Sequence, residues 1–211
     1  MNDLESFLSD VTGVVHVGAN IGQESLLYQS YDLDVIWIEP LPQAFEALLV
    51  NTKDFPKQRC FKYLVTDKDN AVYQFYVASN GGCSSSIYDI AEHRHLWPDV
   101  TMSYVIQMTS VTLTTLFKRE NIDAKKHRGL ILDTQGSELL VLYGAIPLLN
   151  EFLYVKIEVA DFNAYEGCCQ LKDIEKFMHM HNFVEHVKYM MPTNGYHPAG
   201  GHYWDIVYKR R

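Results

Sequence analysis

A glycine turn near the N-terminus and a glutamate after the next apolar run are the first residues whose types suggest chemistry. In "VVHVGANIGQE" (14–24), a β-branched run leads into a turn that begins at Gly18 and ends at Gly22. A turn between a strand and a helix leaves backbone N–H groups unpaired and lets a ligand approach the backbone closely. Glu39 follows Gly18 by 21 residues, and its carboxylate can accept hydrogen bonds from both hydroxyls of a ribose. The turn alone is a weak signal, but with Glu39 it predicts an adenosine-type ligand.

The residues inside this turn favour S-adenosylmethionine (SAM) over a dinucleotide. NAD sites usually carry three glycines as G-x-G-x-x-G, whereas Ala19, Asn20 and Ile21 fill this turn. The chain has no Tyr-x-x-x-Lys pair, which short-chain dehydrogenases use for acid–base chemistry. An NAD(P) oxidoreductase stays as an alternative that nicotinamide binding would reveal.

The elements that must position these residues alternate between strand and helix patterns. Short β-branched runs predict strands at 14–17, 34–39, 59–65, 129–133 and 153–158. Apolar residues spaced by three and four predict helices at 21–31, 42–53, 137–150 and 170–182. This alternation predicts an α/β fold, a Rossmann-like doubly wound and mostly parallel sheet with helices on both faces.

Two segments depart from the alternation. Residues 183–191 and 202–210 flank a Gly/Pro loop and predict an antiparallel C-terminal hairpin that closes one edge of the sheet. An insertion at about 71–116 interrupts the pattern and opens with the hairpin-like "AVYQFYVA". With no internal repeat or linker, residues 1–211 are expected to form a single domain.

Composition excludes several classes of function. Eighteen Lys and Arg against 26 Asp and Glu give a net charge of −8, without a basic cluster before Lys209, so nucleic-acid binding is not expected. No run of about 18 apolar residues predicts a membrane span. The four cysteines lack CxxC spacing, and the N-terminus has no signal-peptide pattern. A cytoplasmic protein with reduced thiols is expected.

Five segments together resemble a known family. "VHVGANIGQE", "WIEPLPQAFEAL", "LVTDKDNAVYQFYV", "GLILDTQGSELLVLYGA" and "VKIEVADFNAYEG" are similar, in order and spacing, to the FkbM family of SAM-dependent O-methyltransferases, over about residues 12 to 208. The most specific piece, "LDTQGSELLVLYGA", resembles the family's Asp-x-x-Gly-x-Glu-x-x-x-Leu-x-Gly block. The resemblance implies a class I methyltransferase fold and methyl transfer to a hydroxyl, often on a sugar or another natural product.

The resemblance also implies how the cofactor is held. The turn, with Gly18, Ala19, Asn20 and Gly22, would line the methionine end of SAM. Glu39 would bind the ribose, and Asp67 the adenine edge. The serines of "GGCSSSIYD" would lie near the cofactor's carboxylate or the acceptor, with Ser85 assigned to the cofactor and Ser86 to the acceptor. The alternative for these serines is a polar turn.

Acidic residues at strand ends are the candidates for catalysis. Asp133 ends the fourth predicted strand and Glu158 the fifth, and the carboxyl ends of parallel strands open onto the cofactor crevice. Asp133 is therefore expected at the cofactor and, with Glu158, in catalysis. Either Asp133 or a nearby His is the general base for a weakly acidic hydroxyl, or Asp133, Glu158 and Asp161 hold a divalent cation such as Mg²⁺. A carboxylate that only stabilises a helix start is the plainer alternative.

The loop of the C-terminal hairpin supplies candidate acceptor contacts. Tyr196, His197, His202 and Trp204 stand where class I methyltransferases often place substrate-facing loops, and flat aromatic faces suit sugar rings. Packing against the hairpin explains the same residues equally well. The expected partner is a small-molecule or glycan acceptor with a free hydroxyl.

Departures from the family pattern leave another function open. His16 and Thr114 stand where the family usually has acidic residues, and Ile131 where it often has Lys. A Rossmann-like module that binds SAM without catalysis therefore remains an alternative, as does methylation of a hydroxyl on a non-sugar natural product.

Overall fold

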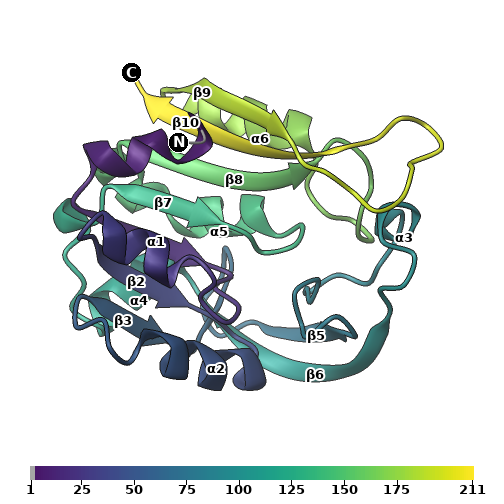
Figure 1. Ribbon diagram of the computed structural model, residues 1–211, viewed down its shortest axis with the longest axis horizontal. Coiled ribbons are helices and arrows are strands. Elements are labelled where there is room, and N and C mark those ends of the chain that lie inside the picture. Colours follow the sequence, from purple (N-terminus) through teal and green to yellow (C-terminus); the bar gives the residue numbers. More distant parts are fainter. Residues whose placement is uncertain (1–2) are drawn as a thin grey trace.

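The main sheet has seven strands, and the carboxyl ends of its parallel strands all lie at one edge (Figure 1). The computed structural model describes residues 3–211. The strand order is β3-β2-β1-β7-β8-β10-β9, in which the first five strands are parallel. Their bounds are β1 (Gly13–Val17), β2 (Asp34–Ile38), β3 (Gln58–Phe61), β7 (Gly129–Leu132), β8 (Tyr154–Ala160), β9 (Phe183–Met190) and β10 (Tyr203–Arg210). The predicted α/β class is confirmed.

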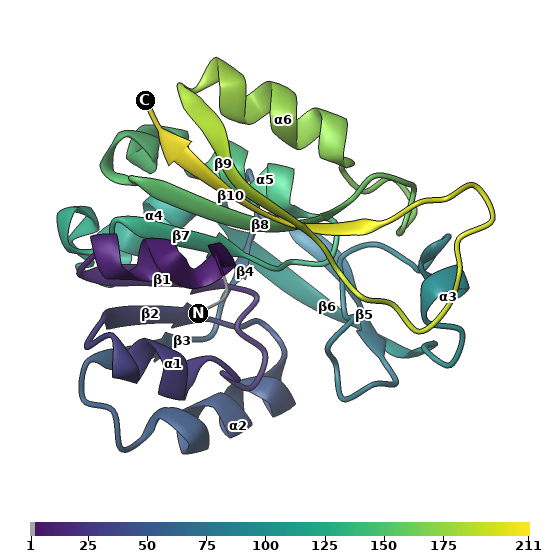
Figure 2. The same cartoon turned by 45° about the horizontal axis from the view of Figure 1, so that its top comes forward.

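Helices cover both faces of this sheet (Figure 2). On one face lie the 3₁₀ helix η1 (Asp3–Asp10), α1 (Ser25–Ser30) and α2 (Pro42–Thr52). On the other face lie α4 (Leu113–Arg119), α5 (Glu138–Gly144) and α6 (Leu171–Met180), with 3₁₀ turns η2 (Ala124–Lys126) and η3 (Ile146–Glu151). Alternate strand residues feed the two cores: Val15 packs with the second group, and Val14 with the first. No helix within residues 3–211 is long and apolar enough to cross a bilayer.

Two predicted helices are shorter than their apolar patterns suggest. The helix expected from residue 21 begins only at Ser25, because the chain is still turning at Gly22, where φ is +75°. The helix expected over 137–150 breaks after Gly144, since Pro147 cannot supply an N–H to a continuing α-helix. The strands before these helices, β1 and β7, end within one residue of the predicted positions.

The C-terminal hairpin forms as expected, but its last strand is not the edge. β10 pairs antiparallel with both β8 and β9, so it lies between them and β9 ends the sheet. Burial explains this order, because Ile206, Val207 and Tyr208 of β10 are buried on both faces while most of β9 is exposed. A strand with two apolar faces belongs inside a sheet.

The insertion builds a second sheet opposite the carboxyl ends of the main strands (Figure 1). The expected strand at 59–65 splits into β3 and a short β4 (Leu64–Val65). β4 pairs with β6 (Met102–Val111), and β6 pairs antiparallel with β5 (Val72–Ala78). The short helix α3 (His93–Leu96) lies between β5 and β6 in sequence. The last residues of the insertion form the start of α4, and their Thr- and Val-rich sequence did not predict a helix.

Candidate active site

Strand pairing brings a row of acidic residues to the carboxyl edge of the main sheet. His16 on β1 pairs with Trp37 on β2 and with Ile131 on β7, which pairs with Lys156 on β8. Because side chains alternate between the two faces of a strand, the residues two positions further along point to the same face as these residues. The residues at those positions, together with the β10 partner of Glu158, are Glu39, Gly18, Asp133, Glu158 and Asp205.

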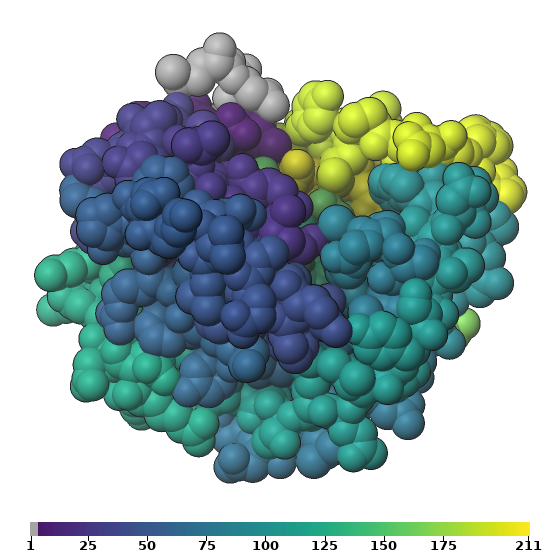
Figure 3. All heavy atoms as spheres, turned by 60° about the horizontal axis from the view of Figure 1, so that its bottom comes forward, coloured from purple at the N-terminus to yellow at the C-terminus, as the bar shows by residue number. Residues whose placement is uncertain are grey.

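A cavity opens beside this row. It encloses about 750 Å³, counting its open mouth. In Figure 3 it is the hollow between the purple N-terminal residues and the blue and teal residues of the insertion. Six of the residues assigned to the cofactor line it: Gly18, Ala19, Asn20, Glu39, Ser85 and Asp133. Gly22 and Asp67 do not line it.

Gly18 sits where no side chain fits. Its φ is +85°, and a Cβ added there would lie 1.7 Å from the backbone oxygen of Asp133. The expectation of unpaired N–H groups in this turn is wrong for its first residues. The N–H groups of Gly18 and Ala19 donate to the Ile38 oxygen at 2.9 and 3.1 Å, because the chain continues to bond to β2 after β1 ends. The turn therefore offers a ligand close approach rather than a set of backbone donors.

Glu39 holds the backbone of this turn through hydrogen bonds to its carboxylate. Its carboxylate accepts the Asn20 N–H at 2.8 Å and the Leu41 N–H at 2.7 Å, and the side chain is buried. Burial raises the pKa of Glu39 to about 7, although these two hydrogen bonds act in the opposite direction. Each carboxylate oxygen has two acceptor positions, so one on each remains for ribose hydroxyls. The bracing role is one that sequence reasoning missed.

Asn20 carries an acceptor without a partner. Its side-chain NH₂ donates to Cys83 Sγ at 3.0 Å, while its Oδ1 is buried and receives no hydrogen bond. Leaving a buried acceptor unpaired costs about 1–3 kcal/mol. A ligand with a hydroxyl or amino group in the cavity would satisfy it. Cys83 also lines the cavity, and nothing in its spacing distinguished it beforehand.

The two candidate catalytic carboxylates are joined through Gln135. Its side-chain amide nitrogen donates to Asp133 Oδ1 at 2.6 Å and to Glu158 Oε1 at 3.2 Å. Burial, with the charge of Glu138, raises the pKa of Asp133 to about 7. Burial and the charge of Asp133 raise the pKa of Glu158 well above its ordinary value. Environments that differ in this way let one carboxyl keep its proton while the other ionises.

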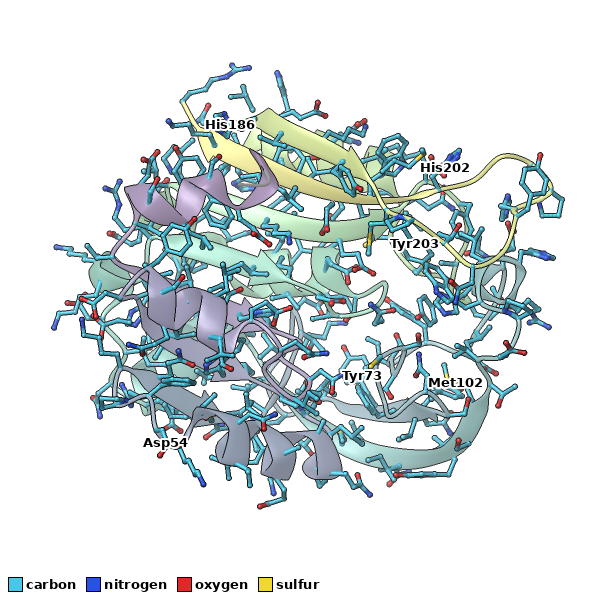
Figure 4. All side chains as sticks on the ribbon, viewed as in Figure 1. Asp54, Tyr73, Met102, His186, His202 and Tyr203 are labelled. Atoms are coloured by element: carbon cyan, nitrogen blue, oxygen red, sulfur yellow. The ribbon has the colours of Figure 1, made fainter. Side chains whose placement is uncertain are left out.

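Glu158 faces a second, smaller cavity of about 240 Å³ on the far side of Gln135. Tyr165 and Tyr203 line it with Glu158. Figure 4 labels Tyr203 at the start of β10 and Tyr73 on β5, on opposite sides of the space between the two sheets. Gln135 lines both cavities and so forms the boundary between them.

The loop after β7 has its own glutamate brace. Oε1 of Glu138 accepts the Thr134 N–H at 2.8 Å and the Gly136 N–H at 3.1 Å. Glu138 is 1% exposed, and burial raises its pKa. Glu138 is close in sequence to Asp133, but its carboxylate is occupied by the backbone of the loop.

Asp161 lies apart from the acids it was grouped with. At the protein surface, its carboxylate accepts hydrogen bonds from the His202 N–H and from Trp204 Nε1–H, both at 2.8 Å. Among the residues that the structure describes, no three His, Cys, Asp or Glu side chains are close enough to hold a metal ion. The expected Mg²⁺ site of Asp133, Glu158 and Asp161 is therefore unsupported.

Most of the predicted acceptor contacts are engaged elsewhere. His197 is buried, and its Nε2 lies 2.7 Å from Glu92 Oε2, which ties the C-terminal loop to the segment before α3. The Ser86 hydroxyl donates to the Gln135 oxygen at 2.7 Å. His202 and Trp204 meet Asp161, as described above. Tyr196, 77% exposed, keeps a free ring face, but the structure does not bring it to either cavity.

Two departures from the family pattern occupy different places. His16 lines the cavity, stacks on Trp37 with ring centres 5.1 Å apart, and has Nδ1 3.1 Å from the Tyr28 hydroxyl. Burial lowers the pKa of His16 to about 4, so the ring is neutral at pH 7. Thr114 lies in α4 and donates to the Gly144 oxygen at 2.8 Å, away from the cavity.

Comparison with known proteins agrees with this architecture. The Methyltransferase FkbM domain matches residues 16–190. No curated protein matches the sequence significantly.

Three solved structures with similar folds are distant from this chain in sequence. M. capricolum TrmK in complex with S-adenosylhomocysteine (SAH) has a TM-score of 0.55 at 10% identity, covering 100% of this chain and 69% of that chain. Magnesium protoporphyrin IX methyltransferase from Synechocystis PCC 6803 with bound SAM has 0.51 at 11% identity, with 99% and 78% coverage. Burkholderia thailandensis 1,6-didemethyltoxoflavin-N1-methyltransferase with bound SAH has 0.51 at 11% identity, with 98% and 74% coverage. These likenesses concern the fold alone.

Proposed function

Because the chain belongs to the Methyltransferase FkbM domain family, we propose that it transfers a methyl group from SAM to a hydroxyl of a neutral sugar or glycan. The observation that carries this proposal is the convergence of Gly18, Glu39 and Asp133 on one cavity. Their strands are adjacent in the sheet, and each residue directly follows its strand at the carboxyl edge. In doubly wound sheets, that edge is where ligands bind.

The cavity fits SAM at both ends. Close to Gly18 the backbone is bare, and the unpaired Oδ1 of Asn20 awaits a donor. Glu39 retains acceptor positions for the ribose. Beyond Glu39, Leu64 and Phe75 provide an apolar lining that suits an adenine ring. Asp67 stands outside this lining, so adenine contacts are assigned to Leu64 and Phe75 instead.

Asp133 is proposed as the general base. When bound, SAM supplies a methyl group on a positively charged sulfur, with neutral SAH as the leaving group. Asp133 lies at the cavity wall, where an acceptor hydroxyl can give its proton to the carboxylate as the new carbon–oxygen bond forms. Burial and the charge of Asp133 raise the pKa of Glu158 well above its ordinary value, which favours its protonated form and limits the repulsion that Asp133 experiences.

Charge in the cavity supports an uncharged acceptor. Glu24, Glu39 and Asp133 line it, and the described residues of the lining include no Lys or Arg. A polyanion such as RNA needs cations to bind its phosphates. A neutral hydroxyl compound needs none, and a sugar is the acceptor class that the family resemblance favours.

Calorimetry and an acceptor panel test the proposal. The chain is titrated with SAM, SAH and NAD, and then incubated with SAM and neutral methyl glycosides, their phosphorylated counterparts, a short RNA and a macrolide aglycone. Released SAH is measured with and without EDTA. We expect SAM and SAH to bind, NAD not to bind, and neutral glycosides to be methylated without a need for metal. Binding without turnover on any acceptor would instead support a SAM-binding module, and absence of SAM binding would overturn the proposal.

A further inference from the structure

Gln135 adopts a backbone conformation that side chains rarely adopt. Its φ is +54°, and the next residue, Gly136, has a φ of +99°. For a residue with a Cβ, the left-handed region costs about 1–2 kcal/mol, and Asn, Asp or Gly are the usual occupants. A glutamine at this position therefore calls for a reason in the contacts of its side chain.

The side chain of Gln135 lies between two half-buried acids. One amide nitrogen donates to Asp133 at 2.6 Å and to Glu158 at 3.2 Å, so both of its hydrogens face carboxyl oxygens. Asp133 directly follows β7 and Glu158 lies on the neighbouring parallel strand β8, and the charge of Asp133, with burial, raises the pKa of Glu158. The amide separates these carboxyl groups and orients both.

Two other segments hold Gln135 in turn. The Tyr165 hydroxyl donates to Gln135 Oε1 at 2.7 Å, which fixes which end of the amide faces the acids. The Ser86 hydroxyl, from the insertion, donates to the Gln135 backbone oxygen at 2.7 Å. Ser86 and Tyr165 are both buried. Every polar group of the Gln135 side chain is thus used, and its place depends on the insertion and on the loop after β8.

The fold of the loop does not need these side-chain contacts. Glu138 already braces the backbone of the loop through the N–H groups of Thr134 and Gly136. The Asp133 N–H also bonds to the Val17 oxygen at 3.0 Å. The contacts of the Gln135 amide are directed at the acids instead.

We propose that Gln135 is a positioning residue for methyl transfer, whose amide holds the Asp133 carboxylate toward the cavity while Ser86 and Tyr165 hold the amide. This inference rests on the proposed role of Asp133 as the base. Ser86, predicted from the sequence to contact the acceptor, instead holds Gln135 in place through its hydroxyl.

The test compares Gln135→Met with Gln29→Met, a matched change at an exposed glutamine on α1. Met keeps the length and approximate volume of Gln but has no amide. For Gln135→Met we expect turnover of a glycoside that the wild-type protein methylates to fall about 100-fold, the size expected for a misplaced reacting group. The KM and the SAH affinity should stay within about threefold of wild type. Gln29→Met is expected to match wild type. A loss confined to KM, or turnover within threefold of wild type, overturns the inference.

A second variant and a structural measurement keep the test decisive. Tyr165→Phe leaves the amide but removes its anchor, and we expect turnover to fall about tenfold, the effect of one lost hydrogen bond. If Gln135→Met does not fold, Tyr165→Phe carries the test, and wild-type turnover in it overturns the inference.

Crystal structures with SAH separate this inference from the proposed function. We expect the Asp133 carboxyl group to rotate away from its wild-type orientation in Gln135→Met. An unchanged orientation overturns the positioning role, even if no acceptor in the panel is methylated. Failure of wild type to bind SAH is the separate result that overturns the proposed function.

Discussion

The turn after β1 and the loop after β7 meet at the same cavity and are braced in similar ways, yet they differ in what they leave free. Each is held by a buried glutamate that accepts backbone N–H groups, Glu39 in the first and Glu138 in the second. The turn leaves a bare backbone at Gly18 and an unpaired acceptor at Asn20. The loop leaves Asp133 beside Glu158, with an amide between them.

Under the proposed function, the turn serves binding and the loop serves chemistry. Backbone geometry shapes the turn, so only a change that alters that geometry or its brace should affect it. Single side chains shape the reactive part of the loop, so an isosteric substitution there is expected to abolish turnover and leave the fold intact.

Gly18→Ala is expected to damage the turn most. The new Cβ would collide with the backbone oxygen of Asp133 at a φ of +85°, so we expect unfolding free energy to fall by about 3 kcal/mol or more and SAH binding to be lost. Urea denaturation and calorimetry measure these effects. Gly167→Ala is the matched control, because its φ is +82° and nothing lies within 4 Å of the added Cβ. Its cost should be about 1 kcal/mol, from backbone strain alone. Equal losses in the two variants would remove the argument from close approach.

Asp133→Asn is expected to leave the turn untouched and stop the chemistry. Turnover should fall by about 100- to 10,000-fold, the contribution of a general base, while SAH affinity stays within about threefold of wild type. In wild type, turnover should fall about tenfold per pH unit below about pH 7, because a base must be ionised and the pKa of Asp133 is raised to about 7. Asp54→Asn, a change at an exposed aspartate far from the cavity (Figure 4), is the control. Retained activity in Asp133→Asn would exclude Asp133 as the base.

Glu39→Gln is expected to weaken binding more than turnover. The Gln amide can accept one of the two N–H groups but turns its own NH₂ toward the other, so we expect SAH affinity to fall about 10- to 100-fold at a cost of about 1–3 kcal/mol. Calorimetry measures the affinity. Glu138→Gln makes the same change in the other brace and should lower stability with a smaller effect on SAH. Should both variants bind SAH as wild type does, the ribose role of Glu39 fails.

His16→Asn is expected to change the pH dependence of stability. In the folded protein burial lowers the pKa of His16 from 6.5 to about 4, so the stability that its neutral form supports is complete above pH 6.5 and is lost as pH falls toward 4. Relative to pH 7, wild type should lose about 2 kcal/mol more than His16→Asn at pH 4.5. Urea denaturation at both pH values gives this difference. The raised pKa of Glu39 acts in the opposite sense in both proteins and cancels in the comparison.

The sheet could be predicted from sequence because its inner strands are almost wholly apolar. "VVHV" and "DVIWIE" are buried on both faces, and their ends mark the carboxyl edge where Gly18 and Glu39 lie. α4 escaped prediction since Thr112 to Thr115 are β-branched or apolar residues typical of strands, and only tertiary packing and the Thr112 cap make them helical.

Parts of the site could not be predicted, because they depend on contacts between distant segments. Gln135 is linked to Ser86 across 49 residues and to Tyr165 across 30, and no local pattern encodes either contact. Asp161 follows β8 closely in sequence, but the direction in which the chain leaves that strand decides that it meets Trp204 rather than Asp133. The hydrophobic pattern locates strand ends, whereas loop paths determine which side chains meet there.

The position of β10 inside the sheet affects the order in which the protein can assemble. During synthesis β9 emerges first but has no neighbour in the sheet until β10 has followed it and paired with β8. The wall that carries Tyr203 and Asp205 is therefore completed late, and a nascent chain paused before β10 would hold the glycine turn after β1 without the finished wall of the second cavity.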